Sequence, residues 1–120
     1  MAPDISDDLC EVQLVHEDAV HAALRNRADD HELAHLADTF QMLASPSRLR
    51  IVEALAGQEM CVCDLAAVVG VSQSAGSHHL RQMRQMSLVA YRKDGRMAYY
   101  RLDDRHVAEL FGTGLEHVRE

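Results

Sequence analysis

A two-residue turn between two short apolar segments constrains the fold of this chain more than any other feature. Asp94-Gly95 joins Leu88–Arg92 to Arg96–Leu102, and both flanking segments are strand-like. An Asp-Gly pair tolerates the positive backbone φ angles that tight hairpin turns require. The sequence therefore predicts one β-hairpin in a chain whose other periodic segments indicate helices.

The segments on either side of the hairpin have the apolar spacing of helices. Ser45-Pro46 ends one helix and begins the next, because serine caps a helix N-terminus and proline suits the first helical position. Glycines follow the predicted helices that end near positions 56 and 69. Helices are expected at about 11–27, 31–44, 47–56, 63–69, 73–86 and 104–119.

Ala66-x-x-x-Gly70 is the pattern of a helix-turn-helix. The small residue lets two helices cross closely, and glycine adopts the left-handed backbone of the turn at little cost. We expect the helix-turn-helix over about 62–86 and a wing over about 88–102. The predicted fold class is mainly α with a small β-hairpin (α+β), a winged helix-turn-helix with flanking N- and C-terminal dimerisation helices. Gly76 is discordant, because a glycine inside a helix costs roughly 1 kcal/mol against alanine and is expected to leave a packing gap.

Length and composition indicate a single folded domain. With 120 residues, 48% of them hydrophobic, the chain is expected to fold over 11–120 behind a flexible acidic arm at 1–10. No apolar run approaches the roughly 20 residues that span a bilayer, and the N-terminus lacks the basic and apolar segments of a signal peptide. We therefore expect a cytoplasmic protein with no membrane partner. Three cysteines do not favour a disulfide framework in such a chain.

The charge of the chain is segregated along the sequence. The net charge is −7, and residues 1–45 alone contribute −8 from ten acidic and two basic residues. Residues 72–101, by contrast, carry +5 from six basic residues and Asp94. Because a local basic patch favours phosphate binding even in an acidic chain, this segment is predicted to contact double-stranded DNA.

The second helix of the predicted helix-turn-helix begins with short polar side chains. These suit contacts to base edges in the major groove, and Arg81 suits a phosphate or a guanine. At the hairpin tip, Arg92-Lys93-Asp94-Gly95-Arg96 is expected to place like charges opposite each other, a repulsion that DNA phosphates would relieve. The predicted DNA-binding residues are Gln73, Ser74, Ser77, His78, Arg81, Arg92, Lys93 and Arg96.

The last predicted helix carries four good ligands for a divalent metal in two pairs, Asp104-x-His106 and His117-x-x-Glu120. His106 and His117 are separated by roughly 16 Å of helix rise, whereas metal–nitrogen bonds are about 2 Å long. The two pairs can meet only if a second copy of the helix runs antiparallel to the first. The spacing therefore predicts a homodimer with two metal sites between its subunits.

Cys61-Val62-Cys63 forms a second candidate metal site. Thiolates prefer soft or borderline metal ions, and cysteines at the start of a helix lose their proton more easily. The same pair could instead sense oxidants or reactive sulfur, although a disulfide across one intervening residue is strained.

Several runs of this sequence occur together in one known family. They are Met60-Cys61-Val62-Cys63-Asp64-Leu65-Ala66, Ser72-Gln73-Ser74, Ser77-His78-His79-Leu80-Arg81 and the C-terminal Asp-x-His-x10-His-x2-Glu. With this combination, the chain from about 33 to 120 closely resembles the ArsR/SmtB metalloregulators. The resemblance implies a homodimeric repressor that occupies operator DNA and leaves when metal binds. It also implies that Asp104, His106, His117 and Glu120 form one zinc site.

The resemblance extends to the cysteine pair. In the family, cysteines at this place join ligands from the N-terminal arm to bind soft metals such as Cd(II) or Pb(II), which implies Cys10 as the arm ligand. The family's arm often offers a second ligand four residues later, where this chain has Leu14. His16 and Asp64 are the alternatives, so the fourth ligand beside Cys10 and the cysteine pair stays open.

We therefore expect a metal-responsive repressor that binds operator DNA as a homodimer and is released by Zn(II), or by Cd(II) or Pb(II) at the cysteine site. We expect neither an enzyme nor a small-molecule substrate. One alternative is a thiol-based redox or reactive-sulfur-sensing repressor of the same fold that uses Cys61 and Cys63. Another is a small zinc enzyme, although no general base near the ligands and no substrate pocket is evident in the sequence.

Overall fold

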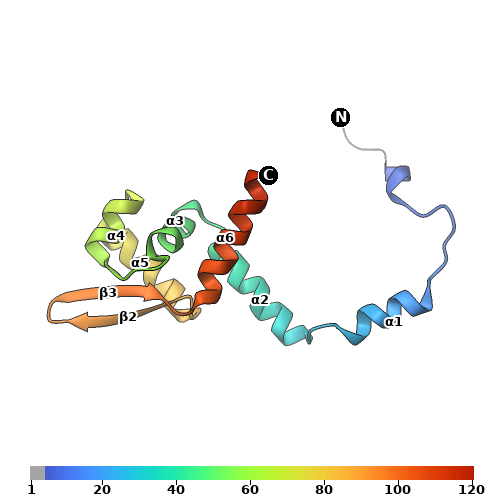
Figure 1. Ribbon diagram of the computed structural model, residues 1–120, viewed down its shortest axis with the longest axis horizontal. Coiled ribbons are helices and arrows are strands. Elements are labelled where there is room, and N and C mark those ends of the chain that lie inside the picture. Colours follow the sequence, from blue (N-terminus) through green and yellow to red (C-terminus); the bar gives the residue numbers. More distant parts are fainter. Residues whose placement is uncertain (1–4) are drawn as a thin grey trace. The chain divides into compact units, whose positions relative to one another are not determined.

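A computed structural model describes residues 5–120, and the chain divides into two compact units between Leu33 and Ala34. Figure 1 shows the elements in chain order. They are η1 (Ile5–Asp8), α1 (Glu17–Arg25), α2 (Asp30–Leu43), α3 (Pro46–Leu55), β1 (Met60–Cys61), α4 (Val62–Val69), α5 (Gln73–Gln85), β2 (Val89–Asp94), β3 (Met97–Leu102) and α6 (Arg105–Arg119). No helix among these is long and apolar enough to cross a membrane.

The first unit contains a shorter helix than the sequence predicted. We expected helix from about 11 to 27, but α1 begins only at Glu17, after an irregular stretch. Its first turn carries Glu17 and Asp18, which interact favourably with the positive end of the helix dipole. The start of α2 follows the sequence closely, because Asp29 and Glu32 form a reciprocal capping box. The N–H of Glu32 donates to Asp29 Oδ1 at 2.8 Å, and the N–H of Asp29 donates to Glu32 Oε1 at 3.3 Å.

In the second unit, polar caps and one glycine set the ends of α3, α4 and α5. Ser45 caps α3 by accepting from the N–H of Arg48, and Ser72 caps α5 by accepting from the N–H of Ala75. Gly70 ends α4 with φ of +80°, a left-handed conformation that only glycine adopts without strain. The turn between α4 and α5 therefore has the predicted helix-turn-helix form.

The sheet has three antiparallel strands in the order β1-β3-β2, one more than the hairpin that the sequence predicted. The added strand β1 pairs Met60 with Tyr100 and Cys61 with Tyr99. The turn is also shifted by one residue. Asp94 pairs with Met97, so the two loop residues are Gly95 and Arg96 rather than Asp94 and Gly95. The positive φ of +59° at Gly95, the first loop position, is typical of a type II′ hairpin turn.

This register corrects the expectation that like charges face each other at the hairpin tip. Arg92 lies opposite Tyr99 and Lys93 lies opposite Ala98, while Arg96 is in the turn itself. No cross-strand pair in the hairpin therefore joins two cations, and the proposed repulsion is absent.

The core lies where α3, α4 and α5 pack against one another and the sheet. It is apolar throughout, and α6 joins it through Val107. Seven side chains are almost fully buried: Ile51, Val52, Leu55, Leu65, Leu80, Met83 and Val89. Because Leu80 and Met83 belong to α5, this helix is anchored along one side and presents its other side to solvent.

Candidate nucleic-acid interface and metal sites

The exposed side of α5 carries most of the residues predicted to contact DNA. Gln73, Ser74, Ser77 and Arg81 line one open hollow along the helix, and His78 is exposed beside them. Successive turns of the helix place these side chains on one face, which suits the reading of base edges in a major groove.

The opposite side of α5 is tied to α3 by a hydrogen-bond network around Arg48. Its Nε donates to Nδ1 of His79 at 3.1 Å, one Nη donates to the carbonyl of Met42 at 3.2 Å, and the other donates to Oε1 of Gln82. Burial, and then the charge of Arg48, lowers the pKa of His79, so the neutral imidazole that accepts this bond is favoured. The network links the end of α2, α3 and the DNA-facing helix.

Gly76 has a structural role that the sequence did not reveal. It is buried where α5 crosses α4, and a Cβ built on it would lie 3.4 Å from Cβ of Ala66 and 3.8 Å from Cγ2 of Val71. A single methyl group would therefore fit in contact with Ala66, and a larger side chain would not. The two small residues allow the helices of the helix-turn-helix to approach closely.

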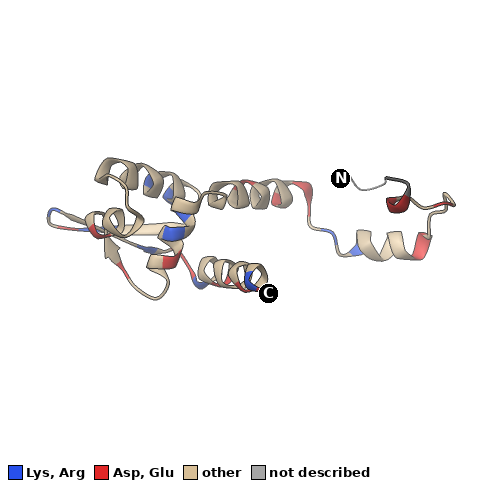
Figure 2. Cartoon of the chain, turned by 90° about the horizontal axis from the view of Figure 1, so that it is seen from above, with Lys and Arg blue, Asp and Glu red and all other residues tan. Residues whose placement is uncertain are grey.

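The basic residues of the wing are not equivalent. Arg92 forms an ion pair with Glu59, while Tyr91 of the wing lies under the guanidinium of Arg84 of α5, 4.1 Å from its ring centroid. Lys93 and Arg96 are exposed, and neither has an ion pair within residues 5–120. Figure 2 shows basic residues, in blue, at the tip of the hairpin. At the hairpin tip, these two cations are therefore better placed than Arg92 to meet phosphates.

The cysteine pair lies at the junction of β1 and α4. Cys61 is buried and is the N-cap of α4, whereas Cys63 and the predicted alternative ligand Asp64 are exposed in its first turn. Both cysteines border a hollow of about 200 Å³ that is also lined by residues of α5 and of the wing, namely Gln73, Ser77, Lys93 and Arg96. The other predicted ligands, Cys10 and His16, are exposed in the first unit.

The four predicted zinc ligands lie at the two ends of α6. Asp104 is the N-cap, and its Oδ1 accepts from the N–H of His106 at 2.9 Å and lies 3.4 Å from Nδ1 of the same histidine. At the other end, Nδ1 of His117 lies 3.9 Å from Oε2 of Glu120. All four side chains are exposed. Each pair therefore presents a nitrogen and an oxygen close enough together to hold one ion, and the donors suit zinc.

Neither candidate metal site is complete within one chain. Among residues 5–120, no group of three or more His, Cys, Asp or Glu side chains gathers in a way that could hold a metal ion. A four-ligand site built from the α6 pairs would require a second subunit.

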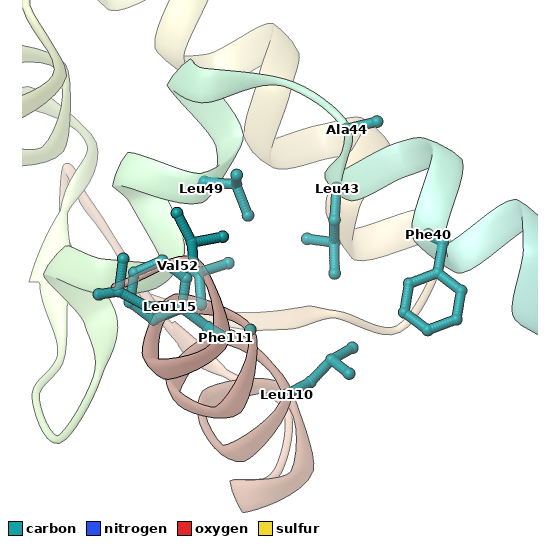
Figure 3. A pocket seen from close by; sticks show the side chains of 10 residues that line it. Phe40, Leu43, Ala44, Leu49, Val52, Leu110, Phe111 and Leu115 are labelled. Atoms are coloured by element: carbon teal, nitrogen blue, oxygen red, sulfur yellow. The ribbon is translucent and has the colours of Figure 1, made fainter. Parts of the chain in front are cut away.

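An apolar groove runs beside the ligands of α6. It has a volume of about 490 Å³, and Figure 3 shows side chains of α2, α3 and α6 converging on it. Its lining residues are Phe40, Leu43, Ala44, Leu49, Val52, Leu110, Phe111, Gly114, Leu115 and Val118. Around the helix axis, His117 lies only about 20° from His106, and Leu110 lies about 40° from it. The ligand stripe and the apolar groove are therefore neighbours on α6.

Sequence reasoning missed the residues that hold the DNA-reading elements in place. Glu59, Arg48 and Gln82 act through partners more than 30 positions away, so no local pattern marks them. The strand β1 left a weak signal, since Met60–Val62 is an apolar run after Gln58 and Glu59, but two residues are too few for a recognisable strand period.

Comparisons with known proteins point to one bacterial family. The model of a bacterial regulatory protein family, the arsR family, matches residues 45–91. A protein of Synechocystis sp. named transcriptional repressor SmtB homolog is 46% identical over 93% of this chain and 85% of its own length. A Staphylococcus aureus protein named cadmium resistance transcriptional regulatory protein CadC homolog is 37% identical over 97% of this chain and 96% of its own length.

Among solved structures, a homodimeric winged helix-turn-helix DNA-binding domain from Mycobacterium bovis, a possible ArsR-family transcriptional regulator, is similar to this chain. It matches with a TM-score of 0.70 and 29% identity, over 79% of this chain and 90% of that one. The shared winged helix-turn-helix fold and the identity over nearly the whole length with curated relatives lead to one conclusion. The chain belongs to the ArsR family of bacterial transcriptional regulators.

Proposed function

We propose that this protein is a metal-responsive transcriptional repressor, which binds double-stranded operator DNA as a homodimer and is released from it by Zn(II). The arrangement of α6 carries the proposal, because its two ligand pairs lie at opposite ends of one helix beside an uncovered apolar groove. The names of the relatives, a repressor and a cadmium resistance regulator, support the repressor role and the response to a divalent metal. Operator binding places its action in the cytoplasm.

The second subunit covers the apolar groove. Phe40 and Val118, which line it, are 49% and 77% exposed, and an exposed apolar surface of this kind is typical of a protein–protein contact. An antiparallel copy of α6 packed there would bring Asp104 and His106 of one subunit to His117 and Glu120 of the other. The homodimeric neighbour structure supports a dimer of this fold.

The chemistry of the site follows from its donors. Two imidazole nitrogens, from His106 and His117, and two carboxylate oxygens, from Asp104 and Glu120, would hold zinc, which would link the two subunits. His106 and His117 must be neutral, and Asp104 and Glu120 ionised, so metal affinity falls in acid. One oxygen of Asp104 accepts the capping N–H of His106, and this hydrogen bond holds the carboxylate in place beside the imidazole.

Release of DNA follows from the packing of α6. It contacts α3, and α3 is tied through Arg48 to His79 and Gln82 of α5. When the two α6 helices are fixed to each other, the two α5 helices are fixed in turn. They then no longer match successive major grooves, about 34 Å apart. A coupling of about 1–3 kcal/mol suffices for a 5- to 150-fold loss of operator affinity.

A titration of the operator-bound homodimer tests the proposal. Fluorescence anisotropy of labelled operator DNA is followed as Zn(II) is added at fixed ionic strength, with Mg(II) as the control ion. The proposal predicts that Zn(II) lowers the anisotropy to that of free DNA, whereas Mg(II) leaves it unchanged. An operator complex that persists at saturating Zn(II) would contradict the regulatory role of metal.

For the cysteine pair we propose a second site, which takes Cd(II) or Pb(II) and uses Cys10 as a further ligand. The hollow that Cys61 and Cys63 share with α5 and the wing supports it, since a soft ion there would lie next to the DNA-facing residues. Cd(II) should produce intense ultraviolet sulfur-to-metal absorption that weakens in Cys10→Ser, with His16→Gln and Asp64→Asn testing the fourth ligand. An unchanged spectrum in Cys10→Ser would remove the arm from the site.

Two alternatives make different predictions in the same experiments. A thiol-based repressor that uses Cys61 and Cys63 would release the operator on treatment with peroxide and would not require Zn(II). The three cysteines are free in the structure. The zinc-enzyme alternative is not supported, because the family and the relatives are transcriptional regulators.

A further inference from the structure

The ion pair between Glu59 and Arg92 distinguishes one wing arginine from the other cations of the hairpin. One edge of the guanidinium faces Glu59, and its remaining nitrogen, Nη1, lies 3.8 Å from Oδ2 of Asp94. Nε donates to the two carboxylate oxygens of Glu59 at 3.0 and 3.1 Å, and Nη2 donates to Oε1 at 2.7 Å. Such a two-point pair fixes direction as well as distance. Arg92 is thus held along the sheet instead of extending into solvent.

A third contact completes the arrangement. The guanidinium of Arg92 lies over the ring of Tyr99, 4.7 Å from its centroid, and Tyr99 faces Arg92 across the β2–β3 ladder. Glu59 precedes β1, which pairs with β3 on the opposite edge of the sheet. The ion pair therefore spans all three strands and joins the hairpin to the segment between α3 and α4.

The electrostatics of the pair agree with its geometry. The hydrogen bonds from Arg92 lower the pKa of Glu59, and those to Glu59 raise the pKa of Arg92, so both groups stay charged. An arginine whose donors already face a carboxylate is poorly placed to neutralise a DNA phosphate. Lys93 and Arg96, in contrast, have no such partner among the described residues.

We infer that Arg92 is a positioning residue of the wing, which Glu59 clamps so that Lys93 and Arg96 reach the DNA, and that it does not itself contact a phosphate. The hairpin has only β3 as a neighbour along β2, and its tip is fully exposed. Without this ion pair, the hairpin tip would sample more positions in the free protein. DNA binding would then cost the additional conformational entropy of ordering the tip. This inference rests on operator binding by the wing, and not on the metal response.

The direction in which one substitution changes the affinity for operator DNA tests the inference. Glu59→Gln removes an acidic charge close to the wing and frees Arg92. If Arg92 contacted DNA, this change would tighten binding. If Arg92 positions the wing, the change weakens operator binding by about five- to twentyfold, which corresponds to a modest exposed ion pair lost from each of two wings. Glu53→Gln is the matched control, because it removes the same charge from another exposed Arg–Glu pair, that with Arg50 on α3.

Substitution of Arg92 separates its geometry from its charge. Lysine keeps the charge but lacks the planar guanidinium group that donates two hydrogen bonds to one carboxylate. Arg92→Lys should therefore weaken operator binding as much as Arg92→Ala, and neither should change the slope of log affinity against log salt concentration. A phosphate contact would make Arg92→Lys resemble the parent protein and would lower the slope of Arg92→Ala by about 1 per subunit.

The measurements use the metal-free homodimer and operator DNA, with circular dichroism confirming that each variant is folded. Amide relaxation at Gly95 and Arg96 should show larger nanosecond motion in Glu59→Gln than in Glu53→Gln. Tighter or unchanged operator binding in Glu59→Gln would overturn the inference, as would full retention in Arg92→Lys. Because no metal is present, a failed zinc response leaves this test intact.

Discussion

The DNA-reading segment, residues 60–102, and the terminal helix α6 carry their function in different ways. In the first, the helix face and the wing are assembled within one chain by capped helices, a close helix crossing and a three-stranded sheet. In the second, a regular helix presents two half-sites at its ends and an uncovered groove between them. One region is therefore assembled within a monomer, whereas the other, by our proposal, gains its function only in the dimer.

This difference explains how the two regions can be coupled. If the DNA-reading segment is rigid, its affinity for the operator can change only when its distance from the same segment of the other subunit changes. We propose that the half-sites of α6 control that distance, because they lie beside the apolar groove that we assign to the second subunit. Variants of α6 should therefore alter the response to metal, and variants of residues 60–102 should alter the metal-free affinity for DNA.

The largest expected effect is the loss of the zinc response in His117→Gln or His106→Gln. In the parent protein, Zn(II) should weaken operator binding by about 5- to 150-fold. Each variant lacks one nitrogen donor in both sites of the dimer, so the factor should fall to about onefold while metal-free affinity is kept. Fluorescence anisotropy measures both, and His35→Gln on α2 is the control for an exposed histidine outside the set. A normal zinc response in both α6 variants would show that the site is not regulatory.

The second prediction separates the wing from the recognition helix. Lys93→Ala combined with Arg96→Ala removes two phosphate contacts, so the slope of log affinity against log salt should fall by up to about 2 per subunit. Operator and random DNA should weaken in the same proportion, since phosphates carry no base information. Gln73→Ala or Ser77→Ala should instead cost operator binding alone about 1–3 kcal/mol. Loss of only operator binding in the wing variant, with an unchanged slope, would reverse these assignments.

A smaller effect should distinguish the two roles of Asp104. Asp104→Ala removes both the N-cap of α6 and a ligand, and should lower the free energy of unfolding by about 1 kcal/mol. Asp104→Ser keeps a capping oxygen without the anionic ligand, so it should retain the stability but still lose the zinc response. Urea denaturation and zinc titration of both variants provide the comparison. Equal stability of the two variants would mean that the cap contributes nothing measurable.

The smallest expected effect concerns the crossing of α4 and α5. Gly76→Ala gains helix propensity of up to about 1 kcal/mol, and its Cβ would meet Ala66 at 3.4 Å, an ordinary contact. We expect a modest rise in the free energy of unfolding and unchanged DNA binding. Gly76→Val would bring two further methyl groups into the same contact and should lower the free energy of unfolding of the protein. A destabilised Gly76→Ala would indicate a crossing that tolerates no side chain.

Much of the fold followed from the sequence because its signals are local. The Ser45 and Ser72 caps, the left-handed Gly70 and the hairpin glycine each act within a few residues, and the structure confirms all four. The errors arose where the signal was weak or remote. The turn shifted by one residue because Asp94-Gly95 and Gly95-Arg96 both satisfy a glycine-dependent hairpin, and only pairing with β3 selects between them.

The candidate sites could be predicted only in part for a similar reason. The α6 ligands stand at fixed positions on one helix, so their spacing could be read directly from the sequence. The partners of Arg92 and Arg48 come from distant segments, so the sequence predicts Arg92 as a DNA contact and carries no sign of its ion pair with Glu59. The relation of Cys10 to Cys61 and Cys63 also joins the two units of the chain, and it stays a prediction.

The central claim is that each metal site is shared between two subunits, and subunit mixing tests it directly. One variant carries Asp104→Asn with His106→Gln, and the other carries His117→Gln with Glu120→Gln. Neither homodimer retains a complete site, but the mixed dimer regenerates one site from the intact pairs of its two subunits. We predict that each parent homodimer ignores Zn(II), whereas the mixed dimer binds one Zn(II) and releases operator DNA. A mixed dimer that binds no Zn(II), with dimerisation verified by size-exclusion chromatography, would contradict the account.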